Sequence, residues 1–255
     1  MRHCFIHFSI LLIALVCLSA AAYTPEPLVE ADLKRQLDAD EILELSAQGP
    51  FLVLKRDHMT AFQRGTVIIV SDWSEHGASP KYLDLLRQQL PDIGWNTLAF
   101  MPPPQPESLE EPVVQAYQEH LQQRMTAAWQ QASLLPGAVV IIAQGSSAAM
   151  LNALYVDNKL SMPAAFIMLG AYLPEQQLNK QLAQLIALNP IPILDISTDH
   201  DNRFVTSQLK RRHQLAEKHF KAVYRQRLIN GSGYNDDVQR WVLQEIYGWL
   251  ISVGL

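Results

Sequence analysis

The chain has 255 residues, of which 49% are hydrophobic and 18% are charged, with 20 basic and 25 acidic residues and a net charge of −5. This balance fits one globular domain with a sizeable core and excludes fibrous and disordered proteins. The excess of acidic residues argues against nucleic acid as a partner.

The N-terminus is typical of a secretory signal peptide. A short basic start precedes an apolar run over residues 10–18, and three alanines at 20–22 form a small-residue cleavage pattern. The run is too short for a transmembrane helix, which needs roughly 20 residues. We therefore expect cleavage near Ala22, a periplasmic protein and no transmembrane segment after cleavage. Cys4 and Cys17 both lie in this segment, so the mature protein would contain no thiol.

The chain divides into the signal peptide (1–22), an N-terminal helical segment (23–50) and one main domain (51–255). In the N-terminal segment a helical pattern covers residues 28–45. In the main domain, short apolar runs rich in β-branched residues and bounded by Gly, Pro or Asp predict strands. These strands begin at Phe51, Thr66, Trp95, Ala138, Ala164, Ile191 and Ala222.

Helical patterns alternate with these strands. Apolar residues recur every three or four positions over 80–90, 113–135, 147–156, 175–188, 204–220 and 236–251. The alternation predicts a mainly parallel sheet of about seven strands with helices on both faces. Only residues 57–65 separate the first two strands, too few for a crossover helix, so we expect these strands to form an antiparallel hairpin. This is the plan of an α/β-hydrolase-like fold.

Several segments of the chain carry a family resemblance. The segments are RGTVIIVSDW (64–73), LLRQQLPDIGWNTLAFMPPP (85–104), VVIIAQGSSAAML (139–151), IPILDISTDHD (191–201) and EIYGWL (245–250). They resemble a family of secreted bacterial α/β-hydrolase-like proteins of uncharacterised function, over nearly the whole chain after the signal. The resemblance implies the fold but no settled activity, so the site has to be argued from its residues.

The usual nucleophile position holds a glycine. In α/β-hydrolases the nucleophile stands in a tight strand-to-helix turn between small residues. The run AQGSS at 143–147 occupies this frame and places Gly145 at the nucleophile position. A frame moved by two residues offers Ser147, but the strand would then have to continue through Gly145. We favour the unshifted frame, in which Ser146 and Ser147 begin a helix, and keep both serines as alternative nucleophiles.

The other two triad positions are incompletely filled. Asp199 and Asp201 follow a strand where the triad carboxylate is expected, with His200 between them, although such residues are also typical helix caps. The loop after the last strand contains Tyr234 but no histidine. Because a serine hydroxyl needs an adjacent base, catalysis would require a rearranged site with His200 as the base.

The loop after the second strand normally helps to form the oxyanion hole. Here Asp72 would place a carboxylate where negative charge develops, which argues against ordinary ester hydrolysis. Asp72, Trp73, His76, Gly145 and Tyr234 are our candidates for a ligand pocket, while packing of Trp73 on the proline-rich loop 101–106 is the alternative. We expect no metal, because no second ligand cluster supports the Asp199–His200–Asp201 run, and no cofactor.

One stretch is basic within this acidic chain. Between positions 203 and 227 it has one acidic residue, Glu217, and eight basic ones, namely Arg203, Lys210, Arg211, Arg212, Lys218, Lys221, Arg225 and Arg227. This stretch is a candidate surface for an acidic envelope component. The alternative is the solvated face of a helix.

Three functions remain open. We favour a periplasmic α/β-hydrolase-fold protein with a degenerate triad that binds a small-molecule ligand or an envelope partner without catalysis. The first alternative is a serine hydrolase of esters or amides that uses Ser146 or Ser147. The second is an envelope scaffold that acts through the basic helix. The sequence does not indicate an oligomeric state.

Overall fold

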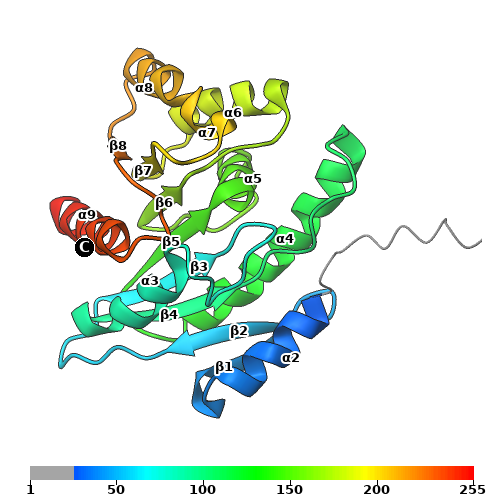
Figure 1. The fold of residues 1–255 in the computed structure, drawn as a ribbon, viewed down its shortest axis with the longest axis vertical. Coiled ribbons are helices and arrows are strands. Elements are labelled where there is room, and N and C mark those ends of the chain that lie inside the picture. The colour runs from blue at the N-terminus through cyan, green and yellow to red at the C-terminus, as the bar shows by residue number, and fades with distance from the viewer. Residues whose placement is uncertain (1–25) are drawn as a thin grey trace, which may run out of the picture.

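A computed structural model of the protein describes residues 26–255, which form an eight-stranded sheet with helices on both faces (Figure 1). The signal peptide expected over residues 1–22 lies outside the described residues. The strands are β1 (Ile42–Ser46), β2 (Pro50–Arg56), β3 (Gly65–Val70), β4 (Trp95–Phe100), β5 (Ala138–Gln144), β6 (Ala165–Leu169), β7 (Ile193–Thr198) and β8 (Tyr224–Ile229).

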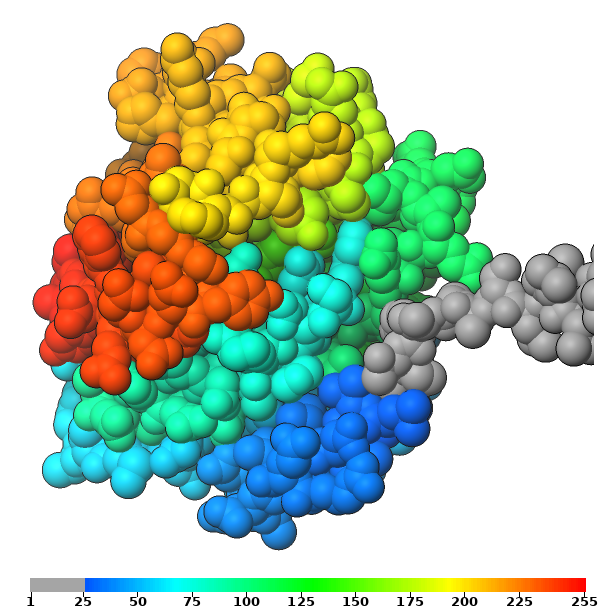
Figure 2. All heavy atoms as spheres, viewed as in Figure 1, coloured from blue at the N-terminus to red at the C-terminus, as the bar shows by residue number. Residues whose placement is uncertain are grey.

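The strands lie in the order β1-β2-β4-β3-β5-β6-β7-β8. Strand β2 is antiparallel to both of its neighbours, and every other pairing is parallel. The N-terminal strands therefore stand at one end of the sheet and β8 at the other (Figure 1). Figure 2 shows the blue N-terminal region and the yellow-to-orange region around α8 at opposite ends of this face. The expected mainly parallel sheet with an antiparallel start is confirmed.

The α-helices are α2 (Glu26–Gln36), α3 (Leu83–Gln89), α4 (Glu111–Ala132), α5 (Gly145–Val156), α6 (Gln176–Leu188), α7 (Arg203–Thr206), α8 (Leu209–Lys218) and α9 (Asp236–Ser252), with short 3-10 turns at Ala39–Glu41 and Pro91–Ile93. Helices α4, α5 and α6 pack on one face of the sheet, and α3 and α9 pack on the other. Alternate residues of the central strand β3 enter the two cores: Ile68 and Val70 contact the first, Val67 and Ile69 the second. A sheet covered on both faces explains why β3 reads as an unbroken apolar run.

Three sequence expectations about the elements were wrong. A helix was expected over residues 28–45, but α2 ends at Gln36. Residues 42–46 instead form β1, because they pair with β2. The antiparallel hairpin is thus β1–β2 and not β2–β3, since β4 lies between β2 and β3. The single helix expected over 204–220 is divided into α7 and α8.

The carboxyl ends of the parallel strands share one edge of the sheet. The loops after β3, β5, β6, β7 and β8 therefore gather at this edge, where open α/β sheets bind their ligands. Within residues 26–255, no helix is long and apolar enough to span a membrane.

Candidate functional site

The turn between β5 and α5 has the shape of a nucleophile elbow, with glycine at its tip. Strand β5 ends at Gln144 and α5 begins at Gly145, as the unshifted frame requires. Gly145 has φ +56°, in the left-handed region that side chains with a Cβ rarely adopt. The backbone thus makes the tight turn, but Gly145 has no side chain that could attack a substrate.

The carboxylate of Asp72 lies where a side chain of residue 145 would stand. Strands β3 and β5 pair with Val70 opposite Ala143, so Asp72 and Gly145 leave the sheet at the same level. A Cβ added to Gly145 would overlap the Asp72 carboxylate. Its distance from the carboxylate atoms would be well below 3.0 Å, the shortest separation that Cβ atoms normally keep from other atoms. The neighbouring loop therefore fills the space that a side chain at position 145 would take.

Asp72 also occupies the two backbone amides of the turn. Its Oδ1 accepts hydrogen bonds from the N–H of Ser146 at 2.8 Å and of Trp73 at 2.9 Å. In α/β-hydrolases the oxyanion hole is formed by the N–H after the nucleophile and an N–H of the loop after this strand. These are the same two positions, so a carboxylate of the chain already binds the amides that would stabilise an oxyanion.

The surroundings of Asp72 shift its pKa upward. Burial raises the pKa of Asp72, against the opposite effect of the N–H groups of Trp73 and Ser146. Tyr172, from the loop after β6, donates its hydroxyl to Asp72 Oδ2 at 3.4 Å. Burial, and then the charge of Asp72, raise the pKa of Tyr172 to about 12. Tyr172 is therefore a neutral hydrogen-bond donor at physiological pH.

The other candidates of this loop serve its own structure. The indole N–H of Trp73 donates to the Tyr117 hydroxyl of α4 at 2.8 Å, and the two rings pack edge to face. His76 Nδ1 accepts the N–H of Ala78 at 3.3 Å, and burial lowers the pKa of His76. Trp73 thus packs between the loop and α4, and His76 is a neutral residue that supports the turn.

The structure does not assemble a triad around the serines. Ser146 and Ser147 are both 0% exposed at the start of α5, and among the described hydrogen bonds none joins either serine to a histidine. His200 instead contacts Asp199, with Nδ1 2.8 Å from Oδ1, at an exposed position. Asp199 also accepts the N–H of Gly231 at 2.8 Å, and this bond is the main reason that its pKa is lowered.

Asp201, the second candidate for the acid position, pairs with a lysine. Its Oδ1 lies 3.0 Å from Lys81 Nζ, its Oδ2 accepts the N–H of Thr198 at 2.8 Å, and its side chain is 4% exposed. In the loop after β8, Gly233 packs directly against the ring of Tyr82, while Tyr234 is exposed. The loops after β7 and β8 are therefore both in contact with residues 81 and 82, which follow β3 in the chain.

The basic stretch is not one continuous surface. Arg203, Lys210, Arg211, Lys218 and Arg227 are exposed, whereas Lys221 and Arg225 are half-buried. Arg212, expected on the surface, is fully buried because it pairs with Asp195 of β7 at 3.2 Å and donates to the Ala171 carbonyl.

Lys221 donates to the Ile191 carbonyl at 2.8 Å, and burial lowers the pKa of Lys221 to about 8. Two of the eight basic residues thus hold the fold together. No cluster of three His, Cys, Asp or Glu side chains suited to a metal ion occurs within residues 26–255.

Sequence reasoning missed Tyr172 and Lys81. Tyr172 lies in the loop after β6, at the same edge of the sheet as Gly145, and none of the candidate residues came from that loop. Lys81 lies ten residues beyond Ser71, far enough from the strand end that its contact with Asp201 depends on the fold of the whole loop. Its place directly after a parallel strand is the sequence feature that could have indicated Tyr172. No sequence feature indicated Lys81.

The family described as "Protein of unknown function (DUF3530)" matches residues 19–116 and 104–252 of the chain. The chain belongs to this family. The expectation of a family without a characterised function is therefore confirmed for this DUF3530 member. No curated protein sequence matches the chain.

Solved structures show which fold the DUF3530 chain has. Est1E from Butyrivibrio proteoclasticus is 10% identical with a TM-score of 0.62, over 84% of this chain and 98% of Est1E. The carboxylesterase Cest-2923 from Lactobacillus plantarum WCFS1 is 14% identical with a TM-score of 0.62, over 84% and 97%. An alpha-beta serine hydrolase homologue from Coxiella burnetii is 14% identical with a TM-score of 0.57, over 82% and 98%. At these identities the likeness shows the α/β-hydrolase fold alone.

Proposed function

We propose that this chain is a non-catalytic α/β-hydrolase-fold protein of the periplasm that binds a ligand or an envelope partner instead of hydrolysing a substrate. One observation carries the proposal: the Asp72 carboxylate stands in the place of the nucleophile side chain and accepts the N–H groups of Ser146 and Trp73. The periplasmic address rests on the signal-peptide pattern of the first 22 residues.

The chemistry of acyl transfer explains why this arrangement opposes hydrolysis. A serine hydrolase needs an activated hydroxyl and free N–H donors that stabilise the oxyanion of the tetrahedral intermediate. Here the donors are already hydrogen-bonded to Asp72, and an ionised Asp72 would repel a second negative oxygen at the same place. Removing one oxyanion-hole donor costs an enzyme about 100- to 1,000-fold in kcat, and here the carboxylate accepts both.

Hydrolysis by Ser146 or Ser147 is the competing function, and an active-site probe distinguishes the two. The purified mature protein is treated with a fluorophosphonate, which modifies activated serines, and any modified residue is mapped by mass spectrometry. Ser146→Ala and Ser147→Ala are the matched variants, and a serine esterase of the same fold is the positive control. We expect no adduct on the folded protein.

An adduct on Ser146 or Ser147 that disappears only in the corresponding alanine variant would overturn the proposal and assign an ester or amide hydrolase. The same mass spectrometer tests export. In periplasmic extracts of the native host, the N-terminal peptide should begin near Tyr23, and a chain that retains residues 1–22 would contradict the proposed address.

A further inference from the structure

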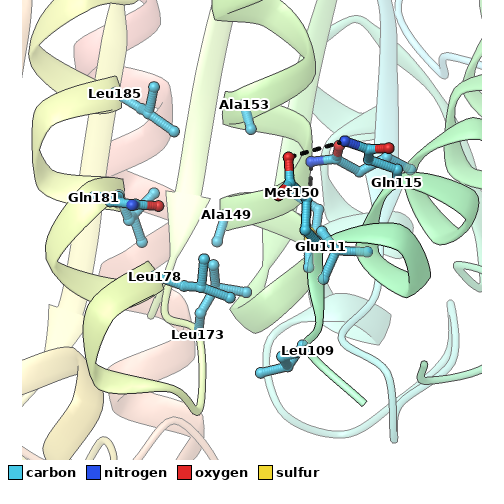
Figure 3. Close-up of a pocket in the computed structure, with 13 residues that line it drawn as sticks. Leu109, Glu111, Gln115, Ala149, Met150, Ala153, Leu173, Leu178, Gln181 and Leu185 are labelled. Carbon is cyan, nitrogen blue, oxygen red and sulfur yellow. Dashed lines mark hydrogen bonds between the residues drawn. The ribbon is translucent and has the colours of Figure 1, made fainter. Parts of the chain in front are cut away.

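A groove of about 420 Å³ runs beside the elbow helix, between α4 and α6 (Figure 3). Its volume lies within the range of small-molecule pockets, about 300–1,000 Å³. The lining consists of nine apolar residues (Leu109, Val114, Ala149, Met150, Ala153, Leu173, Leu178, Leu182 and Leu185), three glutamines (Gln115, Gln118 and Gln181) and Glu111.

Small residues on α5 create the depth of the groove. Ala149 and Ala153 are four residues apart, so they lie on the same face of α5, one turn above the other. On α6, Leu178, Leu182 and Leu185 line the facing side with the same helical spacing. Larger side chains at 149 and 153 would close the space, so the alanines leave room for an elongated apolar group between two helices.

The polar lining residues select against anionic ligands. None of the thirteen lining residues is a lysine, arginine or histidine, so a bound anion would find no counter-charge there, and burying an unpaired charge is costly. The one carboxylate, Glu111, is exposed and accepts a hydrogen bond from Gln115 at 3.3 Å. Glutamine amides both donate and accept, which suits a hydroxyl, ester or amide group.

The groove begins next to the degenerate elbow. Ala149 stands one helical turn beyond Gly145 on α5, and Leu173 directly follows Tyr172, whose hydroxyl contacts Asp72. A ligand in the groove would therefore lie alongside the site that has lost its nucleophile.

We propose that this groove binds the aliphatic chain of an uncharged small molecule, with the leucines and alanines around the chain and the glutamine amides at its hydroxyl or carbonyl group. The proposal rests on the proposed non-catalytic function and names the class of ligand.

Two probes of equal chain length test the selection against charge. Binding of 1-octanol and of octanoate at pH 8 is measured by titration calorimetry on the mature protein. We expect 1-octanol to bind and octanoate to bind at least about tenfold more weakly, because the carboxylate would be desolvated without a cation.

Variants locate the binding. Ala153→Phe would fill the groove and should abolish binding of 1-octanol, whereas Ala116→Phe, at an exposed position of α4 outside the lining, should leave it unchanged. Leu178→Asn, at a half-buried lining position, provides a second variant that replaces two methyl groups with a polar amide and adds no bulk. Unfolding temperatures of all three establish that each is folded.

Failure of this proposal can be told apart from failure of the proposed function. Undetectable 1-octanol binding, equal affinity for octanoate, or unchanged binding in both folded lining variants would each overturn the ligand assignment. Fluorophosphonate labelling of a serine would instead overturn the loss of catalysis and would leave a positive groove result standing.

Discussion

The carboxylate of Asp72 and the Cα of Gly145 are so close that residue 145 has no room for a Cβ while Asp72 keeps its position. The two residues come from neighbouring parallel strands, and their level is set by the pairing of Val70 with Ala143. Asp72 is also held by the N–H of Ser146, the residue after Gly145. The glycine and the aspartate therefore depend on each other, and substitutions at the two positions should not be independent.

Gly145→Ala should destabilise the fold by about 2–6 kcal/mol. The left-handed backbone conformation contributes about 1–3 kcal/mol and the overlap with Asp72 a further 1–3 kcal/mol. In an Asp72→Gly background the overlap disappears, so the cost of Gly145→Ala should fall by about 1–3 kcal/mol. Urea unfolding of the wild type, both single variants and the double variant gives this coupling energy. Additive free energies would show that the two residues do not share the space.

The pH dependence of stability should change in Asp72→Asn. Because burial raises the pKa of Asp72, the folded protein keeps this proton to a higher pH than the unfolded chain does. The contribution of Asp72 to the free energy of unfolding is then greatest below the unfolded pKa and falls as pH rises towards the folded pKa. Asparagine keeps the size of the side chain and an acceptor for both N–H groups, and its amide can donate to the Tyr172 hydroxyl in place of the bond that Tyr172 donates to Asp72, but it does not titrate.

The wild type should therefore lose stability relative to Asp72→Asn as pH rises from about 4, and the difference should level off once Asp72 is ionised in both states. Urea unfolding midpoints of both proteins across a pH series measure this difference. A difference that stays constant, or that moves in favour of the wild type as pH rises, would contradict the raised pKa.

Local patterns in the sequence predict most of this fold, and non-local pairing decides the rest. Short apolar runs alternate along the chain with segments of helical spacing, and these runs locate β2 to β8. They can be recognised because each strand is buried on both faces or bounded by turn residues. It fails for residues 42–46, where the short run in an acidic segment becomes a strand only by pairing with β2. The pattern also fails to predict which strands form the hairpin. Residues 57–64 are too few for a crossover helix, but they are long enough to pass over one strand, which is roughly 5 Å wide. Strand β4 can therefore lie between β2 and β3.

The site shows the same division. The sequence predicts the turn at Gly145, because this tight strand-to-helix turn has a residue pattern of its own. It also places Asp72 in a loop that follows a strand. The contact of Tyr172 with Asp72 and that of Lys81 with Asp201 join loops that are 100 and 120 residues apart. Side-chain contacts over such separations depend on strand order and register, which no local pattern contains.

Arg212→Ala should be far more harmful than its helical neighbour Arg211→Ala. Arg212 and Asp195 are both 0% exposed, and removal of the guanidinium would leave a buried carboxylate without its counter-charge. Such a loss costs about 3–5 kcal/mol, whereas an exposed arginine usually changes stability by less than about 0.5 kcal/mol. Urea unfolding of the two variants makes the comparison. Equal, small effects would place Arg212 with the solvated residues of α8.

The glycine at the elbow also affects how the chain could change over evolution. A side chain at this turn would hold the backbone in a conformation that costs about 1–3 kcal/mol, a cost that Gly145 does not carry. The substitution Gly145→Ser would introduce this backbone cost without creating an activated nucleophile. Asp72 would still fill the space, and no histidine follows β8. A nucleophile at position 145 would therefore require several changes, of which the first is harmful, so single mutations in succession do not readily lead to one.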